Sequence, residues 1–246
     1  MDRLRDGECT EEDWNLVCRT CSKSTMTSVE WNERFGDDVD DVTYLFNTNK
    51  EVNQYNNKRL TQLGKPIALI EAEHTGKSKS MSSDNFMGLA CGLFLSVCAK
   101  VVMTSNVCLP AGLCNGTVGT VKDIIYKEGE APPSLPWFVL VDFGDAYTGP
   151  DFFPDRDDRK GWVPVQPYTS TEWTASGSSA GTGVTEHSRT MLPLKLAWAW
   201  TTWKVQGQTI RGMLVADLGG KENEHGLSYT AFSRVTRLFN FGIIGG

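Results

Sequence analysis

A short apolar run, Met213-Leu-Val-Ala-Asp-Leu218, lies between two longer segments near the end of the chain, Leu192–Thr209 and Gly226–Val235. The run is closed by Gly219-Gly220, a pattern typical of a strand that is buried on both faces of a parallel sheet. We predict a helix in each flanking segment. A helix, a buried strand and a second helix in succession indicate an α/β sheet of the nucleotide-binding kind.

The second predicted helix carries an arginine, Arg234, beside its packed face. The apolar residues that share this face recur at spacings of four, four and three: Leu227, Ala231, Val235 and Leu238. A guanidinium held at the margin of a packed helix can act as an arginine finger, which reaches charge developing on phosphate in a neighbouring domain. Such a finger would contribute little to the stability of the fold. The alternative role is structural, a partly buried ion pair between Arg234 and Asp217 that holds the helix to the sheet.

Four segments spread along the chain carry a family resemblance. They are Leu45-Phe-Asn-Thr-Asn-Lys-Glu-Val-Asn53, Ala111-Gly-Leu-Cys-Asn-Gly-Thr-Val-Gly-Thr-Val121, Thr202-Trp-Lys-Val-Gln-Gly-Gln-Thr209 and Tyr229-Thr-Ala-Phe-Ser-Arg-Val235. In these residues the chain resembles the Pif (petite integration frequency) family of superfamily-one DNA helicases, and the last two segments resemble that family's fifth and sixth motifs. The resemblance runs from about Arg3 to Leu238. Each segment alone would be a weak signal, whereas four in the right order are specific.

The resemblance implies roles for individual residues. Arg234 would be the catalytic arginine finger. The residues implied at the nucleotide cleft are Gln206, Gly207, Thr48 and Asn49, and those implied to face nucleic acid are Lys204, Thr202, Asn106 and Asn115. For Thr48 and Asn49 the alternative is that they cap a helix running from about Lys50 to Leu63. The family has His in place of Trp203 and Ser in place of Val205, and these departures predict a loop that is altered in function.

A phosphate-binding loop is absent from the sequence. Such a loop needs Gly, four residues, Gly-Lys and then Ser or Thr, so that backbone N–H groups surround the phosphates and the hydroxyl holds magnesium. The nearest string, Glu73-His-Thr-Gly-Lys-Ser78, lacks the first glycine and is predicted to be a polar loop. The resemblance therefore implies a second RecA-like lobe of a two-lobed motor. ATP and magnesium would bind only together with a separate first lobe.

The chain divides into five predicted segments. They are a helical connector at 1–34, a first part of a RecA-like α/β lobe at 35–112, an inserted small Src-homology-like β-barrel at 113–168, a flexible linker at 169–188 and a second part of the lobe at 189–246. In the connector, Thr10 and Asp13 form a near capping box that starts a short helix. The linker is predicted from composition, because Ser176–Gly183 contains mainly Gly and Ser.

The barrel is predicted from three short strands separated by Gly, Pro and Asp turns: Thr117–Ile125, Trp137–Phe143 and Trp162–Val165. The family resemblance implies a barrel at the same place. Two of its aromatic residues, Phe143 and Trp162, could form a platform on which single-stranded bases stack, each contact contributing roughly 1–3 kcal/mol. The alternative, which we favour, is that both rings fill the small core of the barrel.

Composition and charge are compatible with a folded chain that binds nucleic acid locally. Apolar residues make up 40% of the chain and charged residues 22%, close to globular averages, which argues against wholesale disorder. The formal net charge is −6, and the excess of acidic residues lies in residues 1–41. From His187 onward, seven Lys or Arg residues face three acidic ones. A locally basic lobe can still follow phosphates, because binding depends on local charge and counterion release.

Cysteine and histidine do not predict a metal site. The chain has an odd number of cysteines, seven, and its first residues do not resemble a secretory leader, so we expect reduced thiols in an intracellular protein. A nuclear location is a separate expectation. Cys18 and Cys21 form the only close pair in the sequence. The three histidines are scattered along the chain: His74, His187 and His225. No zinc ligand set follows, and no apolar run approaches the ~20 residues that a membrane-spanning helix needs.

The sequence therefore predicts two functions of different classes. The first, which the family resemblance implies, is the C-terminal part of an ATP-dependent DNA helicase that moves from five-prime to three-prime on single-stranded or forked DNA. It would supply the arginine finger and part of the DNA track, and would serve genome maintenance through DNA repair, recombination and telomere maintenance. The second is a non-catalytic, helicase-derived remnant that binds nucleic acid or a partner protein. The missing phosphate loop favours the second function for the isolated chain.

Overall fold

The computed structural model describes residues 3, 6–36, 39, 42–178, 181–210, 212–219 and 226–245, and for 175–178 and 181–184 it describes the backbone alone. The chain forms two compact units. Unit 1 comprises residues 1–56 and 198–246, and unit 2 comprises residues 57–197.

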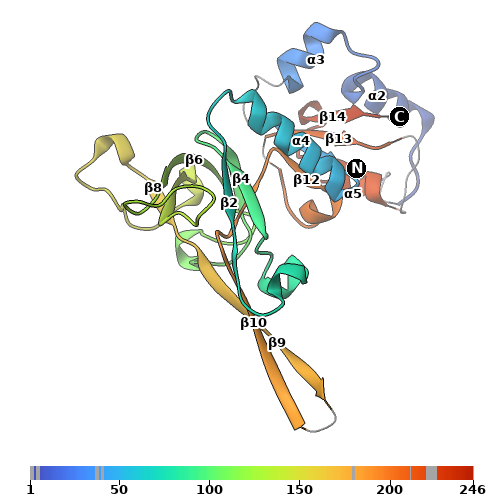
Figure 1. Cartoon of the computed structure of the whole chain (residues 1–246). Helices are drawn as coiled ribbons and strands as arrows, with labels where there is room; N and C mark the ends of the chain where they lie inside the picture. Colours follow the sequence, from blue (N-terminus) through green and yellow to red (C-terminus); the bar gives the residue numbers. More distant parts are fainter. Residues whose placement is uncertain are drawn as a thin grey trace. The chain divides into compact units, whose positions relative to one another are not determined.

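Unit 1 is built on a parallel four-stranded sheet (Figure 1). Its strands, in spatial order, are β12 (Ala199–Thr201), β1 (Val42–Phe46), β13 (Met213–Asp217) and β14 (Phe241–Ile244). The register places Tyr44 between Ala199 and Val215. All five residues of β1 are buried, as expected for a central strand of a parallel sheet. The predicted strand at 213–218 is confirmed, since β13 pairs in parallel with both β1 and β14.

Helices cover both faces of this sheet. They are α2 (Glu11–Cys21), α3 (Ser28–Phe35), α4 (Asn49–Gln62) and α5 (Leu227–Phe232), with short 3-10 turns η6 (Thr202–Val205) and η7 (Leu238–Asn240). Because side chains alternate along a strand, Tyr44 and its partner Val215 share one face, where they pack with Phe35 of α3. The opposite face carries Phe241, whose ring centroid lies 4.5 Å from that of Phe232 in α5. Unit 1 is therefore the α/β arrangement that the sequence predicts.

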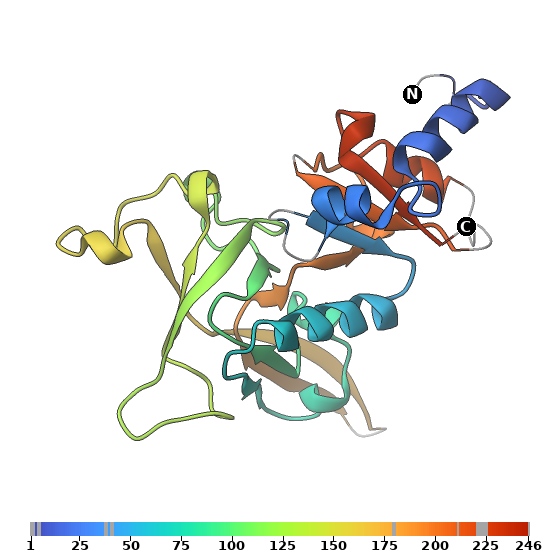
Figure 2. The same cartoon turned by 90° about the horizontal axis from the view of Figure 1, so that it is seen from above.

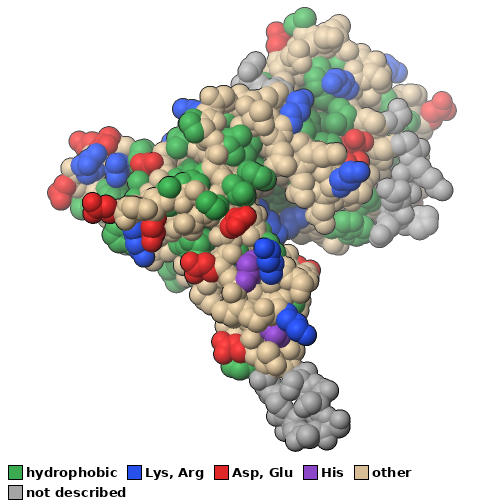
Figure 3. Space-filling model, viewed as in Figure 1, with side chains coloured by type: hydrophobic (Ala, Val, Ile, Leu, Met, Phe, Trp, Pro, Cys, Tyr) green, Lys and Arg blue, Asp and Glu red, His purple; other side chains and the backbone are tan. Residues whose placement is uncertain are grey.

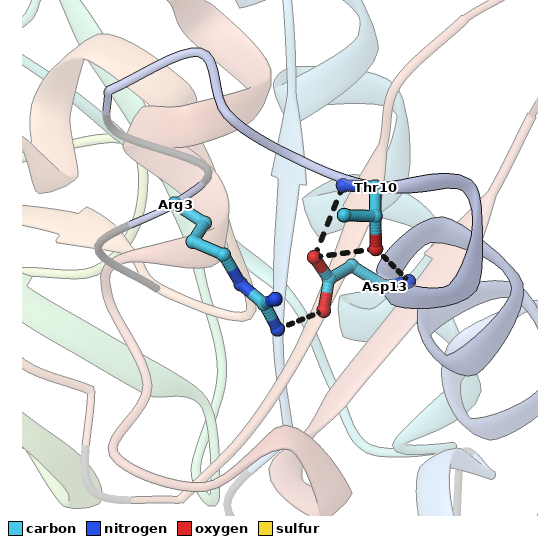
Figure 4. Close-up of polar contacts among 3 residues, drawn as sticks. All are labelled: Arg3, Thr10 and Asp13. Carbon is cyan, nitrogen blue, oxygen red and sulfur yellow. Dashed lines mark hydrogen bonds and ion pairs between the residues drawn. The ribbon is translucent and has the colours of Figure 1, made fainter.

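Each of the first two described helices begins with a capping box. In α2 the Asp13 N–H donates to Thr10 Oγ1 (3.2 Å), and the Thr10 N–H donates to the Asp13 carboxylate (3.1 Å; Figure 4). Arg3 donates to the same carboxylate at 2.6 Å. The backbone and hydroxyl hydrogen bonds from Thr10 hold the pKa of Asp13 below its usual value. The predicted capping box is confirmed, and Thr27 and Glu30 repeat it in α3. Figure 2 shows α2 and α3, drawn in blue, beside the strands of unit 1.

The predicted helix over Leu192–Thr209 is wrong. This segment contains two short strands, β11 (Leu194–Leu196) and β12, followed by η6. The free side of β12 is bound by the amide of Asn56 in α4, whose Nδ2 donates to the Ala199 carbonyl (3.1 Å) while the Ala199 N–H donates to Oδ1 (2.8 Å). The amide takes the place of a neighbouring strand and satisfies the backbone there. Tertiary pairing thus overrides the helical pattern.

The last helix is shorter than predicted. Leu227 and Ala231 are buried on its inner face, as expected, but α5 ends at Phe232, so Val235 and Leu238 lie beyond it. The chain must turn there because η7 and β14 follow within a few residues and β14 pairs with β13. Arg234 therefore stands just after the helix rather than on it.

Unit 2 consists mainly of antiparallel strands. They are β2 (Ala68–Glu71), β3 (Glu73–His74), β4 (Gly92–Leu95), β5 (Lys100–Met103), β6 (Val118–Ile125), β7 (Phe138–Asp142), β8 (Trp162–Val165), β9 (Tyr168–Ser178), β10 (Gly181–Met191) and β11. The short 3-10 turns are η1 (Ser78–Ser80), η2 (Ser83–Phe86), η3 (Leu109–Ala111), η4 (Gly144–Ala146) and η5 (Asp157–Arg159). The largest sheet has the order β11-β5-β6-β7-β8, and smaller sheets join β2 to β4 and β3 to β10 and β9.

Two predicted domain boundaries are wrong. β5 and β11 lie outside the predicted barrel at 113–168 but belong to the same sheet as β6, β7 and β8. Residues 57–112, predicted to be part of the RecA-like lobe, belong to unit 2. The reason is pairing between distant segments, since β5 pairs with both β11 and β6. Closure of the five strands into a barrel stays a prediction.

The predicted flexible linker at 169–188 is wrong over its described residues. They belong to the hairpin of β9 and β10, whose register runs from Tyr168 opposite Met191 to Ser178 opposite Gly181. Figure 1 shows the hairpin as a long two-stranded ribbon within unit 2. Tyr and Thr residues near its base favour extended backbone, and cross-strand hydrogen bonds then hold the Gly- and Ser-rich part as a ladder. Composition alone carries no information on this pairing.

A buried arginine joins the hairpin to the loop between β3 and β4. Arg189 of β10 has no exposed surface, and its guanidinium donates to the carbonyl oxygens of Leu89 (2.7 Å), Met81 (2.9 Å) and Ser78. The same guanidinium lies 4.5 Å from the centroid of the Phe86 ring. Arg189 therefore acts as a structural cross-link of unit 2.

The string that ends in Gly76-Lys-Ser78 has a structural role beside this cross-link. Gly76 has a positive φ of 58°, and a Cβ at this position would collide with the ring of His187. The Lys77 N–H donates to Nδ1 of His187 at 3.0 Å. The predicted loop is only partly present, because Glu73 and His74 form β3 and Ser78 begins η1, so only residues 75–77 are loop.

Candidate functional site at the carboxyl ends of the parallel strands

The parallel sheet of unit 1 brings two of the quoted motifs to one edge. β1 ends at Phe46 and is followed by Thr48 and Asn49, while its parallel neighbour β12 ends at Thr201 and is followed by η6. The register pairs Phe46 with Thr201, so both strands end at the same level. In open α/β sheets, ligands bind outside the carboxyl ends of the strands. The candidate site is this edge.

Thr48 forms a capping box at the start of α4. Its N–H and its hydroxyl donate to Oε2 of Glu51 (3.0 and 2.6 Å), and the Glu51 N–H donates back to Thr48 Oγ1 (3.3 Å). Asn49 is the first residue of the helix. The capping alternative is therefore confirmed for Thr48. A nucleotide-binding role for Thr48 and Asn49 stays a prediction, and it is compatible with the cap because the helix begins at this edge.

The loop after β12 alternates anchored and exposed residues. Thr202 is buried and its hydroxyl bonds to the Phe46 carbonyl (3.5 Å), and Val205 has no exposed surface. The predicted nucleic-acid contact of Thr202 would therefore need its backbone rather than its hydroxyl. Trp203, Lys204 and Gln206 are exposed. Gly207 is also exposed and has φ +79°, a conformation that favours glycine and turns the chain away from the sheet.

Arg234 binds the loop that carries these residues. Its Nη1 donates to the carbonyl oxygens of Gln208 (3.0 Å) and Val205 (3.4 Å), and its Nε donates to Thr230 (3.0 Å). Nη2 donates to Ser233 Oγ at 2.7 Å. The backbone takes part as well, since the Ile210 N–H donates to the Arg234 carbonyl (2.8 Å). The half-buried guanidinium thus fastens the segment after α5 to the loop after β12.

The predicted alternative, an ion pair between Arg234 and Asp217, is not the contact that the structure shows. The Arg234 partners are carbonyl and hydroxyl oxygens, whereas Asp217 accepts a hydrogen bond from the Gly219 N–H (2.9 Å). Sequence reasoning missed the carbonyls of Val205 and Gln208 because their loop lies far from Arg234 in the chain. The guanidinium has a structural role in addition to any catalytic one.

The other two predicted nucleic-acid residues lie in unit 2. Asn106 and Asn115 are exposed and meet in one loop system, where the Asn115 N–H donates to Oδ1 of Asn106 (2.9 Å). The structure thus divides the predicted nucleic-acid residues into two groups, one in each unit. Their contact with nucleic acid stays a prediction.

Of the two aromatic residues considered for base stacking, Phe143 is buried and Trp162 is partly exposed. Phe143 is buried in the core of unit 2, as the favoured alternative holds, so it offers no platform. Trp162 is partly exposed, with the Arg159 guanidinium 6.0 Å from its ring. Two further tryptophans, Trp137 and Trp173, are more than half exposed, and sequence reasoning did not single them out as surface residues.

Charge does not gather into a basic patch on the face drawn in Figure 3. There the described Lys and Arg side chains lie singly or in small groups among acidic and other polar side chains. Phosphate binding on this face would depend on individual cations. Scattered cations favour weak rather than strong binding to phosphates.

The described residues hold no group of three or more potential metal ligands. His225 lies outside these residues. Cys21 is buried, and burial raises the pKa of its thiol to about 11, so it stays protonated at neutral pH. Among the described residues, no helix is both long and apolar enough to cross a membrane.

A parallel sheet between two helical layers, with its candidate residues at the carboxyl ends of the strands, defines unit 1 as a RecA-like α/β lobe. Known proteins include relatives that are similar to the chain in sequence. The chain is 26% identical to the ATP-dependent DNA helicase Pif1 of Campylobacter jejuni over 205 residues, which cover 80% of the chain and 40% of that protein. It is 24% identical to human ATP-dependent DNA helicase PIF1 over 97% of the chain and 31% of that protein. No family model matches the chain.

Solved structures agree with these relatives. The fold is similar to Pif1 helicase from Candida albicans with a TM-score of 0.67 and 23% identity, covering the whole chain and 52% of that structure. Bacteroides Pif1 in complex with ADP-AlF3 and single-stranded DNA has a TM-score of 0.67 and 18% identity, with coverage of 98% and 47%. The chain therefore resembles Pif1 helicases in sequence and has their fold, as predicted. It spans less than half the length of the curated relatives and about half of the solved chains.

Proposed function

We propose that the chain is the part of a Pif-type DNA helicase that supplies an arginine finger and part of the DNA track. The observation that carries this proposal is the coupling of Arg234 to the loop of Val205 and Gln208 at the carboxyl edge of the sheet. A residue that senses phosphate charge is thereby joined to a loop that carries Lys204. Such a link is what a motor needs to pass the state of the nucleotide to the strand.

The remaining parts of the reaction would come from a first lobe. That lobe would bind ATP and magnesium through a phosphate loop, and Gln206, Gly207, Thr48 and Asn49 would complete the cleft from this side. Movement from five-prime to three-prime, a role in repair, recombination and telomere maintenance, and a nuclear location belong to the same proposal. They follow from the resemblance alone.

A non-catalytic role is the second candidate. The sequence favours it, because these 246 residues contain no phosphate-loop motif. The structure favours it as well, because the segment most similar to that motif, Glu73–Ser78, makes hydrogen bonds with His187 and Arg189 within the fold. Such a remnant would bind nucleic acid or a partner protein without turning over ATP. The two candidates differ in what happens when a first lobe is supplied.

The chain alone should not hydrolyse ATP. A finger and one edge of a cleft cannot hold the triphosphate and magnesium, so phosphate release should equal that of a protein-free blank, with or without oligo(dT). The measurement is a phosphate-release assay at several protein concentrations. Release that rises with protein and disappears in the Arg234→Ala variant would contradict the prediction.

The chain should bind single-stranded DNA weakly and in a salt-sensitive way. Each phosphate neutralised releases counterions, so the logarithm of the binding constant should fall against log salt with a slope of about −0.7 per contact. Replacing Lys204 with alanine should make this slope shallower by about 0.7 if Lys204 neutralises one phosphate. Fluorescence anisotropy with labelled oligo(dT) between low and physiological salt measures both. A constant affinity across this range would argue against electrostatic binding.

A further inference from the structure

Trp203 is the exposed member of a group of three tryptophans. Trp198 and Trp200 come from the same segment and are almost fully buried, whereas 46% of Trp203 is exposed. Its position follows from the geometry of η6. In a 3-10 turn, residues three apart share one side, and the residues at these positions, Thr202 and Val205, are buried. Trp203 and Lys204, which lie between them, are therefore presented outward.

The backbone under Trp203 is held from several directions. Thr202 bonds through its hydroxyl to the carbonyl of Phe46 in β1, and the Trp203 carbonyl accepts the Gln206 N–H at 3.2 Å. Arg234 donates hydrogen bonds to the carbonyls of Val205 and Gln208, which follow Trp203 in the chain. A large ring on a fixed turn loses little conformational freedom when a ligand covers it. The indole is thus prepared for binding, although its exposure costs the fold some apolar burial.

We propose that Trp203 is a stacking platform for one base of a single nucleic-acid strand, with Lys204 beside it for the adjoining phosphate. This inference rests on the proposed function and names a residue that the function itself does not require. An indole face accepts any base, while an ammonium group next to it attracts the backbone, and this pair of contacts is the usual chemistry of sequence-independent strand binding. The site adds base contacts to a loop whose proposed role otherwise involves phosphate alone.

The test compares two oligonucleotides of equal length, oligo(dT) and a strand in which abasic sites replace the bases. The full chain and its Trp203→Ala variant are titrated against both at low salt. Loss of a base stack should weaken oligo(dT) binding by about tenfold and leave the abasic strand unchanged. Trp203→Phe should restore most of the oligo(dT) affinity, because a smaller aromatic ring still stacks. Trp14→Ala removes a tryptophan of the same unit that is 48% exposed, and it should change neither affinity.

The outcomes separate the inference from the proposed function. Equal weakening of both strands by Trp203→Ala, or no weakening, would overturn the stacking role while leaving strand binding intact. A parent chain that binds neither strand would instead overturn the DNA-binding part of the proposed function, and the inference with it. A third arm uses a fluorescent ADP analogue with a two-lobed chimera, in which this chain is joined to the part of the Campylobacter jejuni relative that it does not match. If Trp203→Ala weakens binding of the ADP analogue but not of oligo(dT), Trp203 stacks on the base of the nucleotide and the inference is wrong.

Discussion

Replacement of Arg234 with alanine should lower ATP turnover about a thousandfold or more in a two-lobed chimera. The chimera joins this chain to the part of the Campylobacter jejuni relative that the chain does not match. A finger acts where charge develops on the transferred phosphoryl group, so the loss should appear in kcat rather than in KM. The measurement is steady-state ATPase kinetics with saturating oligo(dT). Full activity in the variant would reject the finger assignment.

The structure changes the expected effect of this variant on stability. Sequence position alone predicts an almost unchanged melting temperature, but the guanidinium makes hydrogen bonds with Thr230, Val205, Gln208 and Ser233. Their loss should cost about 1–3 kcal/mol, and hence several degrees, because backbone oxygens lose a charged donor. A large loss of kcat together with this modest loss of stability is the expected signature of both roles.

Two neighbouring substitutions serve as controls for Arg234. Ser233→Ala removes the 2.7 Å hydrogen bond that orients one end of the guanidinium, so it should reduce kcat by much less than the loss of the arginine itself. Arg237→Ala removes an exposed arginine three residues further on, and it should leave kcat unchanged. Equal losses from Arg234→Ala and Arg237→Ala would indicate a general effect of positive charge.

Replacement of Arg189 with alanine should strongly destabilise unit 2. The side chain is fully buried, supports three carbonyl oxygens and lies against Phe86, so its removal leaves both a cavity and unsatisfied acceptors. We expect a loss of about 3–5 kcal/mol in the free energy of unfolding. Urea unfolding followed by circular dichroism measures this loss. Hydrogen exchange of residues 75–90 shows where protection disappears.

Charge and volume can be separated at the same position. Arg189→Met keeps most of the apolar volume but supplies no donor, so most of the destabilisation should persist if the carbonyl hydrogen bonds dominate. Arg156 is exposed and pairs with Asp158 on the surface, and Arg156→Ala should cause no measurable change. Full stability of Arg189→Met would show instead that packing, rather than hydrogen bonding, makes this residue important.

The sequence by itself determined those parts of the fold that have local signals. The apolar run of β13, the capping box at Thr10 and the α/β class of unit 1 could be predicted because side-chain pattern and capping chemistry act within a few residues. The four motifs and their order could also be recognised in the sequence. They indicated the family resemblance that the relatives confirm. The sequence also identified Arg234 as a candidate, although its function stays a prediction.

Only the tertiary structure decided features that depend on distant partners. The Trp-rich segment is a strand because β1 and the Asn56 amide bind it, and the Gly- and Ser-rich segment is a hairpin because β9 and β10 pair residue by residue. Sequence distance likewise hid the link from Arg234 to Val205 and Gln208. Nearly every residue has the same backbone donor and acceptor, so the sequence does not show which distant segment will bind them. Packing in three dimensions determines the partner.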